Sequence, residues 1–204
     1  MTIIVTVKND EKTIIGADKR LLENDIIVSE NASKILIKEL LISSYNHVEY
    51  EYFLIAFSGL YSLFELLETF TVPAKEPRET FLEYLYKTLT PKLNSHLRDY
   101  NFLQQYNNGQ NGVDWELIIA YKNELFLIEY TLGVCEIQTP YYATGAPRDI
   151  ALGSLHTYYH DHPRPVEIFM VKKAIEACAA HHVSCNNNME LYSINKTGEI
   201  KQIK

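Results

Sequence analysis

The feature that most limits how this chain can fold is that its strand-like and helix-like segments come in blocks. Each of two blocks of short strands, rich in β-branched and aromatic residues, is followed by a pair of segments with apolar residues at helical spacing. The predicted order is strands at 3–7, 13–17, 26–28, 34–37 and 50–57, helices at 60–70 and 81–97, strands at 116–121, 124–130, 134–138 and 141–144, helices at 148–159 and 166–181, and a strand at 190–194. Alternating strands and helices would predict a parallel sheet. This order instead predicts an α+β fold, with helices layered on mainly antiparallel sheets.

Helix-breaking residues divide these segments further. Pro91 lies inside the helix expected at 81–97 and is expected to kink or split it. The polar run Asn107–Gly112 reads as a loop between the two halves of the chain. Because each half alone would leave one face of a sheet uncovered, we expect a single domain over residues 1–204.

Composition narrows the class of protein. Hydrophobic residues make up 47% of the chain and charged residues 22%, as in ordinary globular proteins, and the net charge is −7. An acidic chain argues against nucleic acids and anionic membranes as partners. No apolar run approaches the roughly 20 residues of a membrane span, and the segment after Met1 lacks the features of a signal peptide. The three cysteines follow no disulfide or CxxC pattern. We therefore expect a cytoplasmic protein.

The start of the chain contains a candidate nucleophile. Thr2 is small, and an initiator methionine is normally removed when the next residue is small. The trimmed chain would begin with a hydroxyl and a free α-amine on one residue, and the reference pKa of that amine, about 7.7–8.0, leaves part of it neutral at cytosolic pH. Such an amine can accept the hydroxyl proton and activate the oxygen for attack. Many proteins that begin with Met-Thr have no such activity, so this feature needs further support.

Two charged residues provide that support. Asp18 ends the second predicted strand, and Lys34 opens a later one. A lysine ammonium beside Thr2 would lower the pKa of its hydroxyl and of its amine, and Asp18 would keep that lysine charged and in place. Taken singly, either residue is more often an ordinary surface charge.

Taken together, these segments resemble the start of catalytic proteasome β-type subunits and of the bacterial peptidase HslV, which are N-terminal-nucleophile hydrolases. With Thr2 at the family's N-terminal threonine, the family's aspartate and lysine fall on Asp18 and Lys34 without a gap. The resemblance extends more loosely over the whole chain. The matching segments are Thr2-Ile3-Ile4-Val5, Gly16-Ala17-Asp18-Lys19-Arg20, Lys34-Ile35, Phe57-Ser58-Gly59 and Tyr142-Ala143-Thr144-Gly145-Ala146.

The resemblance implies a fold and a chemistry. The fold is a four-layer αββα sandwich of two mainly antiparallel sheets flanked by helix pairs. The chemistry is peptide-bond hydrolysis by Thr2, with the Gly59 backbone N–H binding the oxyanion and Thr144 standing at the family's Gly-Ser-Gly turn. No cofactor or metal is implied. The residues expected to line an apolar substrate pocket are Leu21, Ala32, Leu36 and Phe57.

The resemblance also implies partners. Members of this family assemble into homo-oligomeric rings that enclose their active sites. They cleave unfolded proteins or peptides, and an ATPase unfoldase usually supplies the substrate. We expect the same assembly and the same class of substrate for this chain.

Several positions depart from the family pattern. Thr144 replaces a serine, His182 and Cys185 stand where proteasomes have an aspartate and a serine, and residues 38–52 are longer than the usual connection. Three hypotheses stay open. The first is a threonine-type endopeptidase subunit, and the second is a non-catalytic proteasome-like protein with an assembly or binding role, which a retained Met1 would favour. The third is an N-terminal-nucleophile amidase that acts on small molecules.

A histidine cluster offers a rival site. His156, His160 and His162 lie close together on a predicted helix, which would suit a transition metal. That helix runs into a proline-rich, solvated end, and neither an HExxH motif nor a cysteine partner accompanies the cluster. We therefore predict no metal site. We interpret Cys178 and Cys185 as small buried hydrophobic residues.

Overall fold

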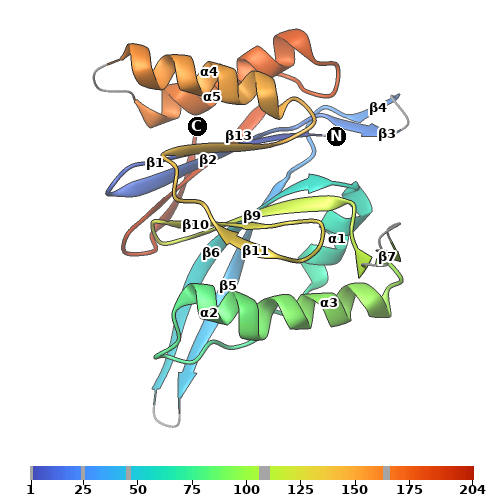
Figure 1. Cartoon of the computed structure of the whole chain (residues 1–204), viewed down its shortest axis with the longest axis vertical. Coiled ribbons are helices and arrows are strands. Elements are labelled where there is room, and N and C mark those ends of the chain that lie inside the picture. Colours follow the sequence, from blue (N-terminus) through green and yellow to red (C-terminus); the bar gives the residue numbers. More distant parts are fainter. Residues whose placement is uncertain (1, 24–25, 45–46, 106–110, 163–165) are drawn as a thin grey trace.

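Two five-stranded antiparallel sheets lie face to face at the centre of the computed structural model, which describes residues 2–23, 26–44, 47–105, 111–162 and 166–204 (Figure 1). The first sheet has the order β12 (Tyr141–Gly145), β1 (Ile3–Lys8), β2 (Lys12–Asp18), β13 (Met189–Asn195) and β14 (Ile200–Ile203). The second has the order β11 (Val134–Glu136), β10 (Glu124–Ile128), β9 (Trp115–Tyr121), β6 (His47–Gly59) and β5 (Ile35–Ser44).

Helices cover the outer faces of both sheets (Figure 1). The first sheet carries α4 (Arg148–Asp161) and α5 (Glu167–His181), and the second carries α1 (Tyr61–Thr69), α2 (Phe81–Tyr84) and α3 (Thr90–Asp99). One buried apolar cluster lies between each helix layer and its sheet, and a third lies between the two sheets. The predicted four-layer αββα sandwich is therefore confirmed.

The first strand is central to this arrangement. On one side Ile3, Val5 and Val7 pack in the cluster beneath α4 and α5, and on the other side Ile4 packs between the sheets. Because both faces are buried, the strand reads as a nearly continuous β-branched run. Its neighbours β2 and β12 hold it along both edges, so the residue just before it has a well-defined position.

The helix predicted at 81–97 is present, and it is interrupted as Pro91 led us to expect. A π-helical turn at Leu85–Leu89 separates α2 from α3, and Pro91 lies in the first turn of α3. Proline lacks an N–H, and its ring crowds the carbonyl four residues earlier, so a regular α-helical ladder cannot continue through it. The wider turn before the proline accommodates both effects.

The strands predicted at 34–37 and 50–57 are much longer than predicted. They form one hairpin, β5 and β6, whose far end extends past the rest of the second sheet (Figure 1). On that far part Val48, Tyr50 and Tyr52 are exposed, and charged residues interrupt the apolar pattern, which explains why periodicity missed it. The predictions missed several shorter strands, namely β3 (Leu21–Glu23), β7 (Gln104–Gln105) and β14.

The predicted loop at 107–112 is described only at its end. Asn111–Gly112 forms β8, a two-residue strand that pairs with β7, so that part of the prediction is wrong. Residues 107–110 lie outside the described residues.

Candidate active site

The fold brings Thr2, Asp18 and Lys34 together. Thr2 immediately precedes β1, Asp18 ends β2, and Lys34 immediately precedes β5. Since β1 and β2 are antiparallel neighbours with Ile4 opposite Ala17, the end of β2 lies beside the start of β1. Lys34 then reaches this point from the second sheet, where it is almost completely buried.

Asp18 is the centre of the cluster. Its Oδ1 accepts hydrogen bonds from Thr2 Oγ1 at 2.7 Å, from the Ile3 N–H at 3.0 Å and from Lys34 Nζ at 2.9 Å, and its Oδ2 accepts one from the Arg20 N–H at 3.0 Å. The carboxylate is fully buried, and these donors satisfy its charge. The Thr2 hydroxyl and the Lys34 ammonium are therefore joined through one carboxylate oxygen.

Lys34 is held from both of its ends. Its Nζ also donates to the Arg20 carbonyl at 2.7 Å, while its backbone N–H donates to Glu190 Oε1 at 2.5 Å. Burial lowers the pKa of Lys34, and the neighbouring charge of Asp18 opposes this shift. Sequence reasoning missed Glu190, because a lone glutamate in a strand has no pattern that would reveal it. Burial raises the pKa of its carboxyl.

The backbone of Thr2 is positioned by the turn after β12. The Ala146 N–H donates to the Thr2 carbonyl at 3.2 Å, and Gly145 pairs with Ile3. Gly145 has a φ of 115°, and a Cβ atom added to it would lie 1.9 Å from the Thr2 carbonyl oxygen. Only glycine allows this close approach.

Gly59 lines a cavity that adjoins this turn. The cavity has a volume of about 530 Å³, and its lining residues are Ser58, Gly59, Leu60, Asp114, Trp115, Glu116, Tyr130 and Ala146. Gly59 has a φ of 155°, and a Cβ atom there would lie 2.3 Å from the Asp114 carbonyl oxygen. The residue predicted to bind the oxyanion and the turn that holds Thr2 thus border one cavity.

Thr144 is buried, and its hydroxyl has an acidic partner. Its Oγ1 donates to Oε2 of Glu116, which is half-buried on β9 of the opposite sheet. Burial raises the pKa of Glu116, while Arg148 opposes that shift. Glu116 is the second residue that sequence reasoning missed, since its contact joins residues 28 positions apart on different sheets.

Solved structures share this fold over nearly the whole chain. BPH from Thiobacillus denitrificans has a TM-score of 0.73 and 17% identity, covering 97% of this chain and 100% of that one. The structure of that protein in complex with epoxomicin has a TM-score of 0.70 and 16% identity, covering 95% and 98%. The eukaryotic HslV from Trypanosoma brucei has a TM-score of 0.61 and 14% identity, covering 95% and 99%.

This chain has the HslV fold. At these identities the likeness establishes that architecture and no activity. No family model and no curated protein matches the chain in sequence.

Within the HslV fold, the segment after α5 lies against the Asp18 cluster. His182 Nδ1 and Ser184 Oγ are 2.7 Å apart, and Ser184 Oγ lies 3.7 Å from Cys185 Sγ. Burial and the nearby charge of Asp18 raise the pKa of Cys185 to about 12, so this side chain stays a thiol. Burial likewise raises the pKa of Cys178 to about 12, in keeping with the interpretation of both cysteines as buried apolar groups.

The four residues predicted to line a substrate pocket are spread over the fold. Phe57 is buried in the cluster between the second sheet and its helices, where it packs edge-on against Trp115, and Leu36 is half-buried against the same cluster. Ala32 is buried, and Leu21 is half-buried at the start of β3. Among the described residues, none of the four lines the cavity at Gly59. Their role in substrate binding stays a prediction.

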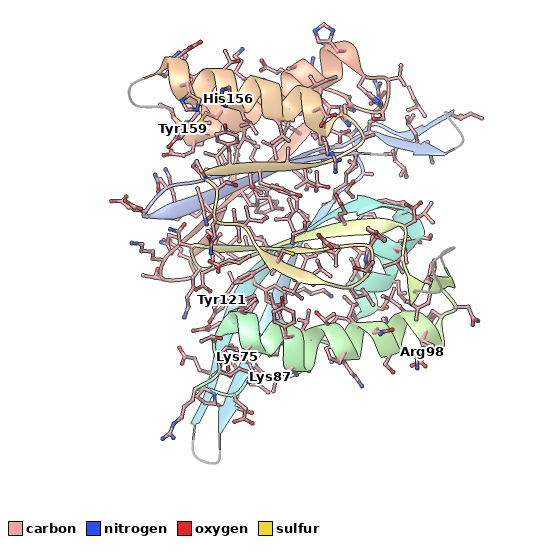
Figure 2. All side chains as sticks on the ribbon, viewed as in Figure 1. Lys75, Lys87, Arg98, Tyr121, His156 and Tyr159 are labelled. Carbon is pink, nitrogen blue, oxygen red and sulfur yellow. The ribbon has the colours of Figure 1, made fainter. Side chains whose placement is uncertain are left out.

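Of the histidines considered as a metal site, His156 and His160 lie on α4 and His162 follows its last residue; Figure 2 shows His156 in the outer helix layer. The rings of His156 and His160 are 4.4 Å apart, while His162 stacks on Tyr158. Within the described ranges, no three His, Cys, Asp or Glu side chains are grouped so that they could hold a metal ion. In the same ranges, no helix has the length and apolar character needed to cross a membrane.

Gly145 provides a first test of how Thr2 is positioned. We expect Gly145→Ala to lower peptide hydrolysis about 100-fold, because the added methyl group must displace the Thr2 carbonyl and misalign its hydroxyl. Gly153→Ala is the matched control, since a Cβ atom at Gly153 on α4 meets nothing within 4 Å. Turnover and thermal unfolding of both variants should be measured. Unchanged turnover in Gly145→Ala would contradict this positioning.

Proposed function

We propose that this chain is a threonine-type endopeptidase subunit whose nucleophile is Thr2 Oγ1 after Met1 has been removed. The observation that carries the proposal is that Thr2 Oγ1 and Lys34 Nζ both donate to one buried oxygen of Asp18. An ion pair with only a structural role would not require a hydroxyl group that donates to the same carboxylate oxygen. The HslV fold and the cavity at Gly59 support the proposal further.

The reaction that we propose is acyl transfer to Thr2 followed by hydrolysis. Thr2 Oγ1 attacks the carbonyl carbon of the peptide bond, and its proton passes to the free α-amine of Thr2, directly or through a water molecule. The Lys34 ammonium favours the alkoxide character of Oγ1, and Asp18 keeps Lys34 in place. The Gly59 N–H stabilises the oxyanion, a contact worth about 2.7–4 kcal/mol in a hydrolase where such a donor was removed.

The second half of the reaction restores the enzyme. The C–N bond breaks as the leaving amine takes the proton back from the α-ammonium, which leaves an ester between Thr2 and the acyl group. Water attacks that ester and gives a proton to the α-amine; the C–Oγ1 bond then breaks as Oγ1 takes that proton back, and the carboxylic acid is released. The steps use only groups of the chain and water.

We propose that residues 1–204 act as one catalytic domain in the cytoplasm. By the resemblance, the subunits form a homo-oligomeric ring that receives unfolded protein or peptide substrates, with an ATPase unfoldase as partner. The net charge of −7 favours protein substrates over nucleic acid.

Intact mass after exposure to epoxomicin tests the nucleophile. Epoxomicin is a peptide epoxyketone, which reacts with the hydroxyl and the amine of one N-terminal residue. We expect a chain that lacks Met1 and carries one adduct, while Thr2→Ala carries none. A wild-type chain that keeps Met1 and remains unlabelled would overturn the proposal. It would favour the non-catalytic alternative, to which the replacements at His182 and Cys185 also point.

The pH dependence of hydrolysis tests the role of Lys34. Because burial lowers the pKa of Lys34, its ammonium loses its proton at a lower pH than an ordinary lysine, whose pKa is about 10.4. The charge that assists Thr2 is present below the folded pKa and is lost as the pH rises through it. We therefore expect kcat/KM to fall on the alkaline side at a pH below the pKa of free lysine. A plateau up to about pH 10.5 in folded protein would contradict this role.

A further inference from the structure

We propose that the cavity at Gly59 binds a positively charged side chain of the peptide substrate, next to the bond that is cleaved. This inference rests on the proposed function, because it names the class of peptide that the same site would accept. It was not expected from the sequence, where the predicted pocket is apolar and formed by other residues.

The charges of the cavity favour a cation. Both charged residues that line it are acidic, the exposed Asp114 and the half-buried Glu116. Glu129 lies near enough to raise the pKa of Glu116 further. The cation that acts on Glu116 is Arg148. Its side chain is 56% exposed, so solvent and salt weaken its effect, and it is not among the described lining residues. A lysine or arginine side chain entering the cavity would therefore meet two carboxylates and no cation among the described lining residues.

The aromatic lining is a second, independent observation. Trp115 is 97% buried, since only 3% of its surface is exposed, yet its indole Nε1–H has no hydrogen-bond partner among the described residues. An unpartnered buried donor is rare in folded proteins. Trp115 and Tyr130 are the aromatic residues of the lining, and aromatic rings attract ammonium and guanidinium groups.

The cavity adjoins the groups that would carry out the reaction. Its lining includes Ala146, whose N–H holds the Thr2 carbonyl, and Gly59, the proposed oxyanion donor. Glu116 also contacts the Thr144 hydroxyl beside β1. A cationic side chain bound to Glu116 would therefore belong to a residue close to the scissile bond, and the cavity would set which peptides are cleaved.

Binding can be measured without catalysis, because Trp115 is the only tryptophan of the chain. We would titrate the Thr2→Ala variant with two peptides that differ only by lysine or norleucine and follow tryptophan fluorescence. We expect the lysine peptide to change the emission and to bind at least about tenfold more tightly, with a preference that weakens as salt is added. Equal affinity for the two peptides, or no change in emission, would overturn the inference.

Two further variants assign the preference to the cavity. In the Thr2→Ala background, Glu116→Gln should remove most of the tenfold preference, and Asp114→Asn should reduce it. Asp99→Asn is the matched control, because it removes one negative charge from an exposed side chain that does not line the cavity. If Asp99→Asn lowers the preference as much as Glu116→Gln does, the charge of the whole surface is responsible and the inference is wrong.

Hydrolysis separates this inference from the proposed function. Internally quenched peptides with lysine or norleucine at each position around the cleaved bond should show one position at which lysine raises kcat/KM about tenfold or more. Epoxomicin labelling of Thr2 without any such position would overturn the inference and leave the proposed function standing. Selective binding of the lysine peptide by a wild-type chain that neither hydrolyses it nor reacts with epoxomicin would overturn the proposed function and support the cationic site.

Discussion

Replacement of Thr2 by alanine is expected to abolish peptide hydrolysis while the protein remains folded. The variant lacks the oxygen that would attack the carbonyl carbon, and no other described hydroxyl donates to Asp18 Oδ1. Loss of a nucleophile in a hydrolase costs about 10⁶-fold in kcat, and we expect at least about 10⁴-fold here. Stability should change little, because Asp18 keeps its hydrogen bonds from Ile3, Arg20 and Lys34.

Thr2→Ser is the control for this experiment. Serine keeps the hydroxyl and the α-amine and loses only a methyl group, so a measurable part of the activity should remain. Turnover of a quenched peptide, thermal unfolding and intact mass should be recorded for both variants. Wild-type turnover in folded Thr2→Ala would exclude Thr2 as the nucleophile and move the chemistry elsewhere.

Replacement of Lys34 by alanine is expected to harm both stability and activity. Lys34 and Asp18 have side chains that are only 4% and 0% exposed, so removing the ammonium leaves a buried carboxylate without its countercharge. Breaking such a pair costs about 3–5 kcal/mol in free energy of unfolding. Activity should fall to near background, since within the described residues no other ammonium contacts Asp18.

Two comparisons make this result interpretable. Lys87→Ala breaks the exposed pair with Glu83 and should change the free energy of unfolding very little, as is usual for a surface pair. The double variant Asp18→Asn with Lys34→Met removes both charges and should be more stable than Lys34→Ala, yet remain inactive. Wild-type activity in either Lys34 variant would show that the ammonium has no part in the reaction.

Part of the site could be predicted from the sequence, because its residues lie close together along the chain. Thr2, Asp18 and Lys34 lie at the ends of strands within the first 34 residues, where their spacing matches a known pattern, and the fold brings them together. Glu116 and Glu190 could not be found in this way. Their contacts join residues 28 and 156 positions apart, and nothing in the adjacent sequence distinguishes them from solvent-facing glutamates.

The fold was predicted better than the extent of its elements. The order of blocks was sufficient for the layered architecture, because sheets and helices with one apolar face have few ways to cover one another. The hairpin of β5 and β6 was underestimated because its far part has an exposed face, so hydrophobic periodicity fades while the backbone pairing continues. Hydrogen bonds between strands are made by the backbone, so the pairing of the exposed part of the hairpin cannot be read from its side chains.

The position of β1 between β2 and β12 has a consequence for the order of events during synthesis. Tyr141, the first residue of β12, is made 138 positions after Ile3, and the strands that complete the first sheet are made later still. At roughly 5–20 residues per second, the ribosome takes on the order of 10 s to supply the second neighbour of β1. During that interval the start of the nascent chain has no completed sheet around it, which gives an aminopeptidase time to remove Met1. In the finished fold Thr2 is buried, so the proposed removal of Met1 would compete in time with closure of the sheet.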